Sequence, residues 1–294
     1  MLINNVNKTA VYRQRTGRYL LLSAIALIFI FPMVFMVMSS LKPSLQLLRD
    51  TSSMRAFLPV GDLSLNNYSA AFRRVPIGRF LFNSTFVTGI TVILGIMINS
   101  MAAYSFSILK WKGKGIILSI IIATFIIPFE TIAIPLLLIV NKLPWIGFSG
   151  FSIGWMNSYH VQIIPFLAYS FQIFLFYQFF KEIPKDFIEA ARIDGAGWFA
   201  IYSKMVIPIS GPVIATAAIL RFLDMWNQYL WPKMVIQSEE FRPVMVGLQY
   251  FFQLNIPWGE VMAYLSIITI PVLAFYLAMQ SAFIESIAST GIKG

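Results

Sequence analysis

Residues 186–208 read DFIEAARIDGAGWFAIYSKMVIP and form a polar interval between two long apolar runs. Pro184 blocks continuation of the preceding helix, and Asp186 can cap a new helix with Glu189 as the reciprocal partner of a capping box. Gly195 suits the left-handed residue that ends a helix. The segment therefore predicts a short helix, a glycine break and a second short amphipathic helix, all too short to span a bilayer.

The composition places the rest of the chain in a membrane. Of its 294 residues, 58% are hydrophobic and 12% are charged, which is too apolar for a soluble domain. Because about 20 apolar residues cross the hydrocarbon layer, the apolar runs predict an all-α polytopic membrane protein with one transmembrane domain over residues 1–294. The polar connector is residues 182–208, and residues 144–159 are expected to form an outer loop or a re-entrant segment. The six expected spans cover residues 19–41, 83–107, 116–140, 162–181, 212–232 and 261–283.

Basic residues near the span ends orient the chain, because they favour the cytoplasmic side. The N-terminal tail and the connector after the second span carry basic residues without an acid: Lys8, Arg13, Arg15, Arg18, Lys110, Lys112 and Lys114. Both termini and the 182–208 connector are therefore expected to be cytoplasmic. The loop of residues 42–82 opposes this rule, because it falls on the outer side. It carries Lys42, Arg49, Arg55, Arg73, Arg74 and Arg79 against only Asp50 and Asp62.

The residue inventory excludes several classes of function. The chain has no cysteine and one histidine, His160, so a disulfide, thiol catalysis or a metal centre is not expected. We expect His160 to be an ordinary polar loop residue. Lys114 lacks the glycine spacing and the hydroxyl of a phosphate-binding loop, so the chain is not expected to bind ATP or to be an enzyme. The net charge of +10 is spread over both faces, which favours lipid headgroups over nucleic acid.

A spaced motif runs through the polar connector. Glu189-Ala190-Ala191 is followed by three residues, Gly195, nine residues and then Met205-Val206-Ile207-Pro208. This resembles the EAA loop of ATP-binding-cassette (ABC) importer permeases, with Met205 and Ile207 in place of Ile and Leu; an ordinary connector with a capped helix is the alternative. Other segments, in order along the chain, resemble the smaller permease subunit of maltose-type carbohydrate importers: Phe31-Pro32, Ser39–Pro43, Ile127-Pro128, Ile134–Leu136, Trp226-Asn227, Trp231-Pro232 and Thr290–Gly294.

The resemblance implies a type I ABC importer permease fold in the bacterial cytoplasmic (inner) membrane. It implies that the connector docks in a cleft of an ATPase subunit, and that the C-terminal tail through Lys293 reaches the ATPase dimer interface. The implied partners are a second, larger permease, two ATPase subunits that bind ATP and Mg²⁺, an extracytoplasmic solute-binding protein and a carbohydrate substrate. No cofactor is expected in this chain. The implied coupling residues are Glu189, Ala190, Ala191, Asp194 and Gly195.

Three charged residues fall within expected spans: Glu130, Arg221 and Asp224. Charges in lipid usually face a cavity or one another. Arg221 and Asp224 are spaced to pair on one helix face. This pair, with or without Glu130, either holds the helix bundle together or contacts a passing solute. A helix broken between Pro128 and Pro135 would free carbonyls to line a cavity.

Aromatic and amide side chains extend this candidate substrate pathway at the end of the fifth span. Trp226 and Tyr229 can stack on sugar rings, although a tryptophan near a span end is also a common headgroup anchor. We expect Trp231 to be a headgroup anchor. Asn227 can bond either a sugar hydroxyl or a neighbouring helix.

The charge of the 42–82 loop bears on the cargo. Its six basic and two acidic residues give +4, and an electropositive mouth would attract an acidic saccharide such as a uronate oligosaccharide of the alginate type. The same residues can instead dock an acidic binding protein, which leaves neutral sugars open. An ion-coupled secondary transporter or channel that works without ATPase subunits is the alternative from another class.

Overall fold

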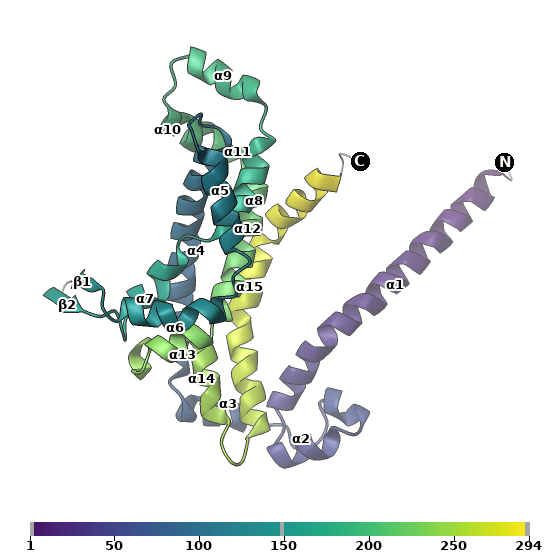
Figure 1. Cartoon of the computed structure of the whole chain (residues 1–294). Coiled ribbons are helices and arrows are strands. Elements are labelled where there is room, and N and C mark those ends of the chain that lie inside the picture. Colours follow the sequence, from purple (N-terminus) through teal and green to yellow (C-terminus); the bar gives the residue numbers. More distant parts are fainter. Residues whose placement is uncertain (1–2, 148–149, 292–294) are drawn as a thin grey trace. The chain divides into compact units, whose positions relative to one another are not determined.

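The structure, a computed structural model, describes residues 3–147 and 150–291. Among these residues, three helices are long and apolar enough to cross a membrane: α1 (Ile3–Ser40), α4 (Ile77–Ser107) and α15 (Trp258–Gly291). Three bent helix pairs bring the number of candidate spans to as many as six. Helices dominate (Figure 1), apart from the antiparallel hairpin of β1 (Pro144–Gly147) and β2 (Gly150–Ile153). The all-α membrane fold expected from the sequence is confirmed.

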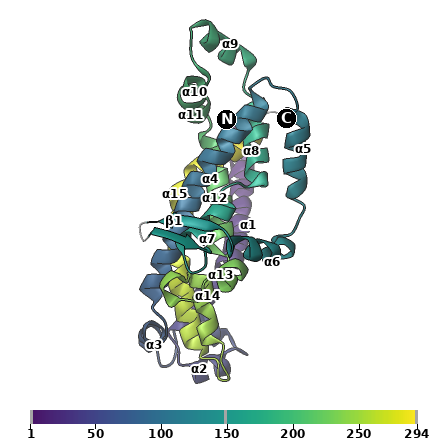
Figure 2. The same cartoon turned by 60° about the vertical axis from the view of Figure 1, so that its left-hand side comes forward.

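The first bent pair breaks beside a proline, which removes a backbone donor. α5 (Lys114–Thr124) and α6 (Phe129–Val140) meet at 101° beside Pro128, and Figure 2 shows them as two separate arms. The expected break between Pro128 and Pro135 is wrong: the break lies before Pro128, and α6 continues through Pro135 to Val140. The second pair joins α7 (Tyr159–Ile163) and η2 (Ile164–Phe166) to α8 (Ser170–Lys181) at 42°. The third joins α10 (Trp198–Ile201), the π-helical η3 (Tyr202–Val206) and α11 (Ile207–Ile209) to α12 (Gly211–Trp226) at 79°.

Several helix ends differ from the expected spans for local reasons. α4 begins at Ile77, directly after Pro76, rather than at residue 83. The expected span 212–232 is interrupted, because α12 ends at Trp226 and α13 (Leu230–Val235) is a separate helix. Asn227 closes the last turn of α12 by donating from Nδ2 to the Leu223 carbonyl at 2.8 Å. The segment 144–159, expected as an outer loop or a re-entrant segment, contains the β1–β2 hairpin.

The described residues divide into two compact units. The first comprises the chain up to Val75 together with Tyr250–Thr269. The end of α1 packs there on η1, where the Phe31 and Phe57 rings lie 4.1 Å apart. Earlier along α1, the apolar side chains from Tyr19 onward are exposed, so lipid or another subunit must cover them. The remaining elements of this unit are α2 (Ser44–Asp50), η1 (Met54–Phe57), α3 (Asn66–Arg74) and the first part of α15.

The second unit comprises Pro76–Gln249 together with the chain from Ile270 onward. Its centre is formed by α4, which packs along α8 and α12. One apolar cluster surrounds Phe176 and Val206 on the side of the polar connector, and a second surrounds Trp231. The remaining short elements are α9 (Lys185–Ile193), η4 (Glu239–Phe241), α14 (Val244–Gly247) and η5 (Leu248–Phe251), the last of which leads into the first unit.

Candidate functional site

The predicted docking loop is built around α9, which extends beyond the ends of α4, α5 and α8 (Figure 1). Pro184 occupies the N-cap position, and no side chain caps the first turn. Asp186 lies inside that turn, so its expected role as the cap is wrong. The helix starts at Lys185 because Pro184 already has a backbone conformation suited to the residue before a helix. The Asp186 carboxylate in this first turn still interacts favourably with the positive end of the helix dipole.

Gly195 ends α9 as the sequence predicts. Its φ angle is +83°, in the left-handed region that costs glycine little. The Ala196 amide donates to the Ala191 carbonyl at 2.9 Å, and the Asp194 amide donates to the Ala190 carbonyl at 3.0 Å. These bonds satisfy carbonyls that the helix end would otherwise leave free. Nothing lies within 4 Å of a Cβ added at Gly195, so the surface beside it is open.

The two faces of α9 differ in exposure. Ala191 is buried against the rest of the loop, whereas Glu189, Ala190, Asp194 and Gly195 are exposed. Of the five predicted coupling residues, Ala191 is therefore the one that holds the helix in place, and the other four face outward. Their small or acidic side chains leave a surface that another protein can approach closely.

Apolar surface adjoins this face. Phe187 is 62% exposed and Ile193 is 86% exposed, which is high for large apolar side chains. A groove of about 280 Å³ lies between the start of α9 and the η3–α11 segment. Its lining is mostly apolar: Ile183, Pro184, Phe187, Ile188, Lys204, Met205, Val206, Pro208 and Ile209.

Two tyrosines connect the loop to the helix bundle, and the sequence analysis did not single them out. Tyr104 of α4 donates from its hydroxyl to the Trp198 carbonyl at 3.0 Å, and Ser100 of α4 hydrogen-bonds the Tyr202 hydroxyl at 2.8 Å. The rings of Tyr104 and Tyr202 lie 5.3 Å apart. Arg192 stacks its guanidinium over Trp198 at 4.5 Å. The loop is therefore attached to α4 by specific polar contacts as well as by apolar packing.

A polar seam of buried side chains runs along α4, and it too was missed. Asn99 donates to Gln172 of α8 at 2.9 Å, and Gln172 donates to the Ala217 carbonyl of α12 at 3.1 Å. These bonds join the three central helices, because an unpaired amide would be costly in the interior. The signal was available as polar residues at helical spacing in an apolar run. The seam residues are Asn83, Ser84, Thr88, Thr91, Asn99 and Ser100.

The expected pair of Arg221 and Asp224 is confirmed. Arg221 is 2% exposed and donates to the Asp224 carboxylate at 2.6 Å. It also donates to the Phe166 carbonyl, and its guanidinium lies 4.4 Å from the centre of the Tyr169 ring. The Asp224 side chain is 44% exposed. Arg221 thus joins α12 to the break between η2 and α8, while Asp224 keeps an open side.

The other candidate pathway residues do not all gather at this pair. Glu130 is exposed and belongs to none of the ion pairs among the described residues, so it is not a third member of the charged group. Trp226 is buried and stacks on Phe222 at 5.4 Å. Asn227 and Tyr229 are exposed beyond the end of α12. The Tyr229 hydroxyl accepts a hydrogen bond from Lys233 at 2.8 Å.

The expectations for Trp231 and His160 are wrong. Trp231, expected as a headgroup anchor, is completely buried and donates from Nε1 to the Val161 carbonyl at 2.9 Å. Hydropathy could not separate the two roles, because both place tryptophan near the end of a span. His160, expected in a loop, lies in α7 and stacks on Trp145 with ring centres 3.9 Å apart.

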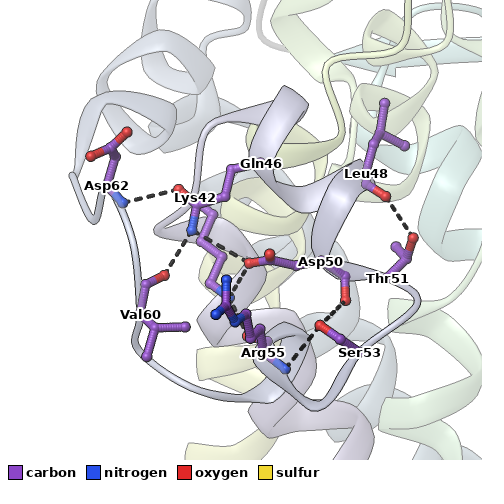
Figure 3. A network of polar contacts seen from close by, with 9 residues as sticks. All are labelled: Lys42, Gln46, Leu48, Asp50, Thr51, Ser53, Arg55, Val60 and Asp62. Atoms are coloured by element: carbon purple, nitrogen blue, oxygen red, sulfur yellow. Dashed lines mark hydrogen bonds and ion pairs between the residues drawn. The ribbon is translucent and has the colours of Figure 1, made fainter.

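Much of the positive charge of the 42–82 loop is neutralised. Lys42 is buried and donates to Asp50 at 3.0 Å and to the Arg55 carbonyl (Figure 3). Within the first unit Arg74 pairs with Glu260 at 2.7 Å. Within the second unit Arg79 pairs with Glu240 at 3.3 Å. Including Glu240 and Glu260 with the loop's own two acids lowers the net charge from +4 to +2.

The Lys42–Asp50 pair gives the first testable prediction. The hydrogen bond from Lys42 lowers the pKa of Asp50 from its ordinary value of 3.8, assisted by Gln46 and opposed by burial. A lowered folded-state pKa stabilises the fold above that ordinary value, and the effect is lost as the pH falls through the lowered pKa. We expect the melting temperature of the wild type to exceed that of Asp50→Asn at neutral pH. The difference should shrink as the pH falls below about 4. A pH-independent difference in thermal unfolding would contradict this.

Fold and site together define a class: an all-α membrane protein whose short exposed helix α9 extends beyond the ends of α4, α5 and α8. Comparisons with known proteins narrow this class to a family. Residues 91–288 match the family described as "Binding-protein-dependent transport system inner membrane component". The chain is 30% identical to the arabinooligosaccharides transport system permease protein AraQ of Halalkalibacterium halodurans, over 92% of this chain and 93% of that one. It is 29% identical to the probable starch degradation products transport system permease protein AmyC of Thermoanaerobacterium thermosulfurigenes, over 92% and 93%.

A solved structure agrees in fold. A chain of a bacterial ABC transporter involved in the import of the acidic polysaccharide alginate superposes with a TM-score of 0.75 at 24% identity, covering 91% of this chain and 95% of that one. The present chain belongs to the family of binding-protein-dependent transport system inner membrane components. It is a membrane-embedded permease of an ABC importer, a kind of transporter that also requires an ATPase and a solute-binding protein. The expected role of the C-terminal tail falls on Lys293, which lies outside the described residues.

Proposed function

We propose that this chain is the smaller permease subunit of an oligosaccharide importer and that α9 is its contact with an ATPase subunit. The observation that carries the docking role is the outward face of α9, where Glu189, Ala190, Asp194 and Gly195 are exposed beside the apolar Phe187 and Ile193. Ala191 supports this face from the buried side. ATP and Mg²⁺ bind to two ATPase partners, which supply the energy that this chain cannot extract itself.

The second proposal concerns topology and the partner permease. The N and C termini and α9 lie on the cytoplasmic side of the bacterial inner membrane, where the lysines that follow α4 also lie. A larger permease completes the pathway and covers part of α1, whose side chains from Tyr19 to Phe31 are exposed and, apart from Ser23, hydrophobic. These 13 residues cover about 20 Å of helix, or about two thirds of the roughly 30 Å hydrocarbon layer.

The third proposal assigns the pathway residues to two roles. Arg221, fixed by three partners, positions α12 against the start of α8. Asp224, Asn227 and Tyr229 are exposed and are proposed to contact the saccharide. Trp226 supports this group from within by stacking on Phe222. Glu130, exposed at the start of α6 after the break in the third span, lines the pathway separately.

The cargo is proposed to be an oligosaccharide, as the name of the AraQ relative states for that protein. The AmyC relative is named for the transport of starch degradation products. The proposal that the saccharide is acidic is based on three arginines of the 42–82 loop. They are exposed and lie outside the ion pairs of the described residues: Arg49, Arg55 and Arg73. Their charge would attract an anionic solute to the entrance, and salt would weaken that attraction.

The test of the cargo is a triple variant, Arg49→Gln with Arg55→Gln and Arg73→Gln, in the complete importer. We expect uptake of an oligouronate to fall several-fold at low salt and to lose its salt dependence, because the steering charge is gone. Uptake of a neutral oligosaccharide serves as the control and should not change. An equal loss for both sugars would assign these arginines to docking of the binding protein. Salt-insensitive uptake of a neutral sugar, without competition by uronates, would exclude the acidic cargo.

A further inference from the structure

The β1–β2 hairpin has two unlike faces. Its register pairs Pro144 with Ile153, Trp145 with Ser152 and Ile146 with Phe151. Side chains alternate between the faces of a strand, and directly paired residues share a face. Pro144, Ile146, Phe151 and Ile153 therefore lie on one side, which is entirely apolar. Trp145 and Ser152 lie on the other.

The apolar face of the hairpin is uncovered by the described residues, whereas the Trp145 face is held in place. Ile146, Phe151 and Ile153 are 80%, 69% and 73% exposed. On the opposite face, Trp145 stacks on His160 with ring centres 3.9 Å apart. The Trp155 indole donates to the Pro144 carbonyl at 3.2 Å. The hairpin is therefore fixed to α7 in a way that leaves its apolar side outward.

The depth of the hairpin in the membrane follows from the length of α4. α4 has 31 residues, which at about 1.5 Å each span about 46 Å, more than the roughly 30 Å hydrocarbon layer. The basic connector after Ser107 marks one boundary of the membrane. About 20 residues back from Ser107, near Val87, α4 reaches the other boundary.

The root of the hairpin lies at that second boundary. Tyr159, at the start of α7, packs its ring on Phe86 with centres 4.9 Å apart. The Tyr159 hydroxyl also donates to Asn83 at 2.8 Å. Both contacts fall within one turn of Val87 along α4. The hairpin thus leaves the helix bundle at the level where hydrocarbon gives way to headgroups.

The composition of the hairpin matches that depth. Residues 144–153 contain no Asp, Glu, Lys or Arg. Trp145 and Trp155 are the kind of aromatic side chain that favours the headgroup level. Lys142 is exposed just before β1, where its ammonium can reach lipid phosphates. A surface that docks a soluble protein usually has a polar rim, which this face lacks.

We propose that the apolar face of the hairpin is covered by lipid. Ile146, Phe151 and Ile153 enter the acyl region of the leaflet opposite the α9 side, while Trp145 and Trp155 remain at headgroup level. The hairpin is then an interfacial anchor that fixes the depth of α7 and of the broken α5–α6 span in the membrane. This role is independent of the cargo and of ATPase docking.

The test uses spin labels, because the chain has no native cysteine to remove. Ile146→Cys and Ile153→Cys are labelled in the complete importer in lipid nanodiscs, and each variant is first shown to retain uptake. Ser152→Cys, on the opposite face, is the matched control, and Asp62→Cys reports an exposed polar loop. Accessibility to oxygen, which concentrates in lipid, is compared with accessibility to a water-soluble nickel chelate.

We expect labels at 146 and 153 to be accessible to oxygen and shielded from nickel. The ratio of the two accessibilities should be several-fold higher than at position 152, and higher still than at 62. Ready access of nickel to 146 and 153 would overturn the proposal, because it would place that face in water. Shielding from both reagents would also overturn it, since a protein subunit would then cover the face. If Ile146→Cys fails to fold, Ile153→Cys decides alone.

Discussion

The double variant Glu189→Lys with Gly195→Asp is expected to abolish ATP-driven uptake while leaving membrane insertion intact. Glu189 is exposed, and a Cβ at Gly195 would meet nothing within 4 Å, so neither change disturbs packing within the chain. Aspartate does enter the left-handed region at Gly195, which costs about 1 kcal/mol locally. The main effect falls on the partner, because a reversed charge and a larger side chain enter the docking face. Each residue that anchors such an interface typically contributes about 2 kcal/mol or more.

The expected loss of ATPase affinity is therefore at least about tenfold, since each 1.4 kcal/mol is a factor of ten. Uptake by whole cells and co-purification of the ATPase measure it. Lys112→Glu is the control, because it reverses an exposed charge in the connector between α4 and α5, on the same side of the membrane as α9 in the proposed topology. Full uptake by the double variant would remove the docking role from α9.

The second large effect concerns the buried arginine. We expect Asp224→Ala to destabilise the protein more than Arg221→Met does, because only the first leaves a buried guanidinium without its carboxylate. Breaking a fully buried pair costs about 3–5 kcal/mol. Because Asp224 is 44% exposed, we expect about 2 kcal/mol, or a fall in melting temperature of about 5 °C.

Combining Arg221→Met with Asp224→Ala should recover most of that loss, since the unpaired cation is then absent. Thermal unfolding of the purified variants measures the order, and Asp62→Ala controls for removal of an exposed carboxylate. If Arg221 instead contacts the solute directly, Arg221→Met will abolish uptake without a stability difference between the two single variants. That outcome would contradict its positioning role.

Local signals in the sequence were sufficient to predict the membrane fold and the helix and glycine break of the 182–208 connector. Long apolar runs predicted a helical membrane protein, and Gly195 marked the end of α9 because few other residues suit a φ of +83°. Pro128 lies at the break between α5 and α6, but the 101° angle between these helices could not be predicted from the chain. The pairing of Arg221 with Asp224 followed from their spacing within one helix.

Long-range contacts were out of reach of the same reasoning. Arg74 pairs with Glu260, which lies 186 residues away, so the loop of residues 42–82 seemed more basic than it is. Trp231 lies near the end of a predicted span, and nothing in the neighbouring residues shows that it packs on Phe129 and Phe166. The bonds of Tyr104 and Ser100 to the docking loop likewise depend on the folded arrangement of α4, α10 and η3.

The most direct measurement is a mild-detergent purification of the tagged chain from its native membrane, followed by an assay of ATP hydrolysis with the solute-binding protein and candidate saccharides. We expect the chain to bring down ATPase subunits and a second, larger permease, with hydrolysis raised by the binding protein and one oligosaccharide. Recovery of the chain alone, active in liposomes under an ion gradient, would contradict the account. It would mean that the Arg221–Asp224 pair serves ion coupling instead.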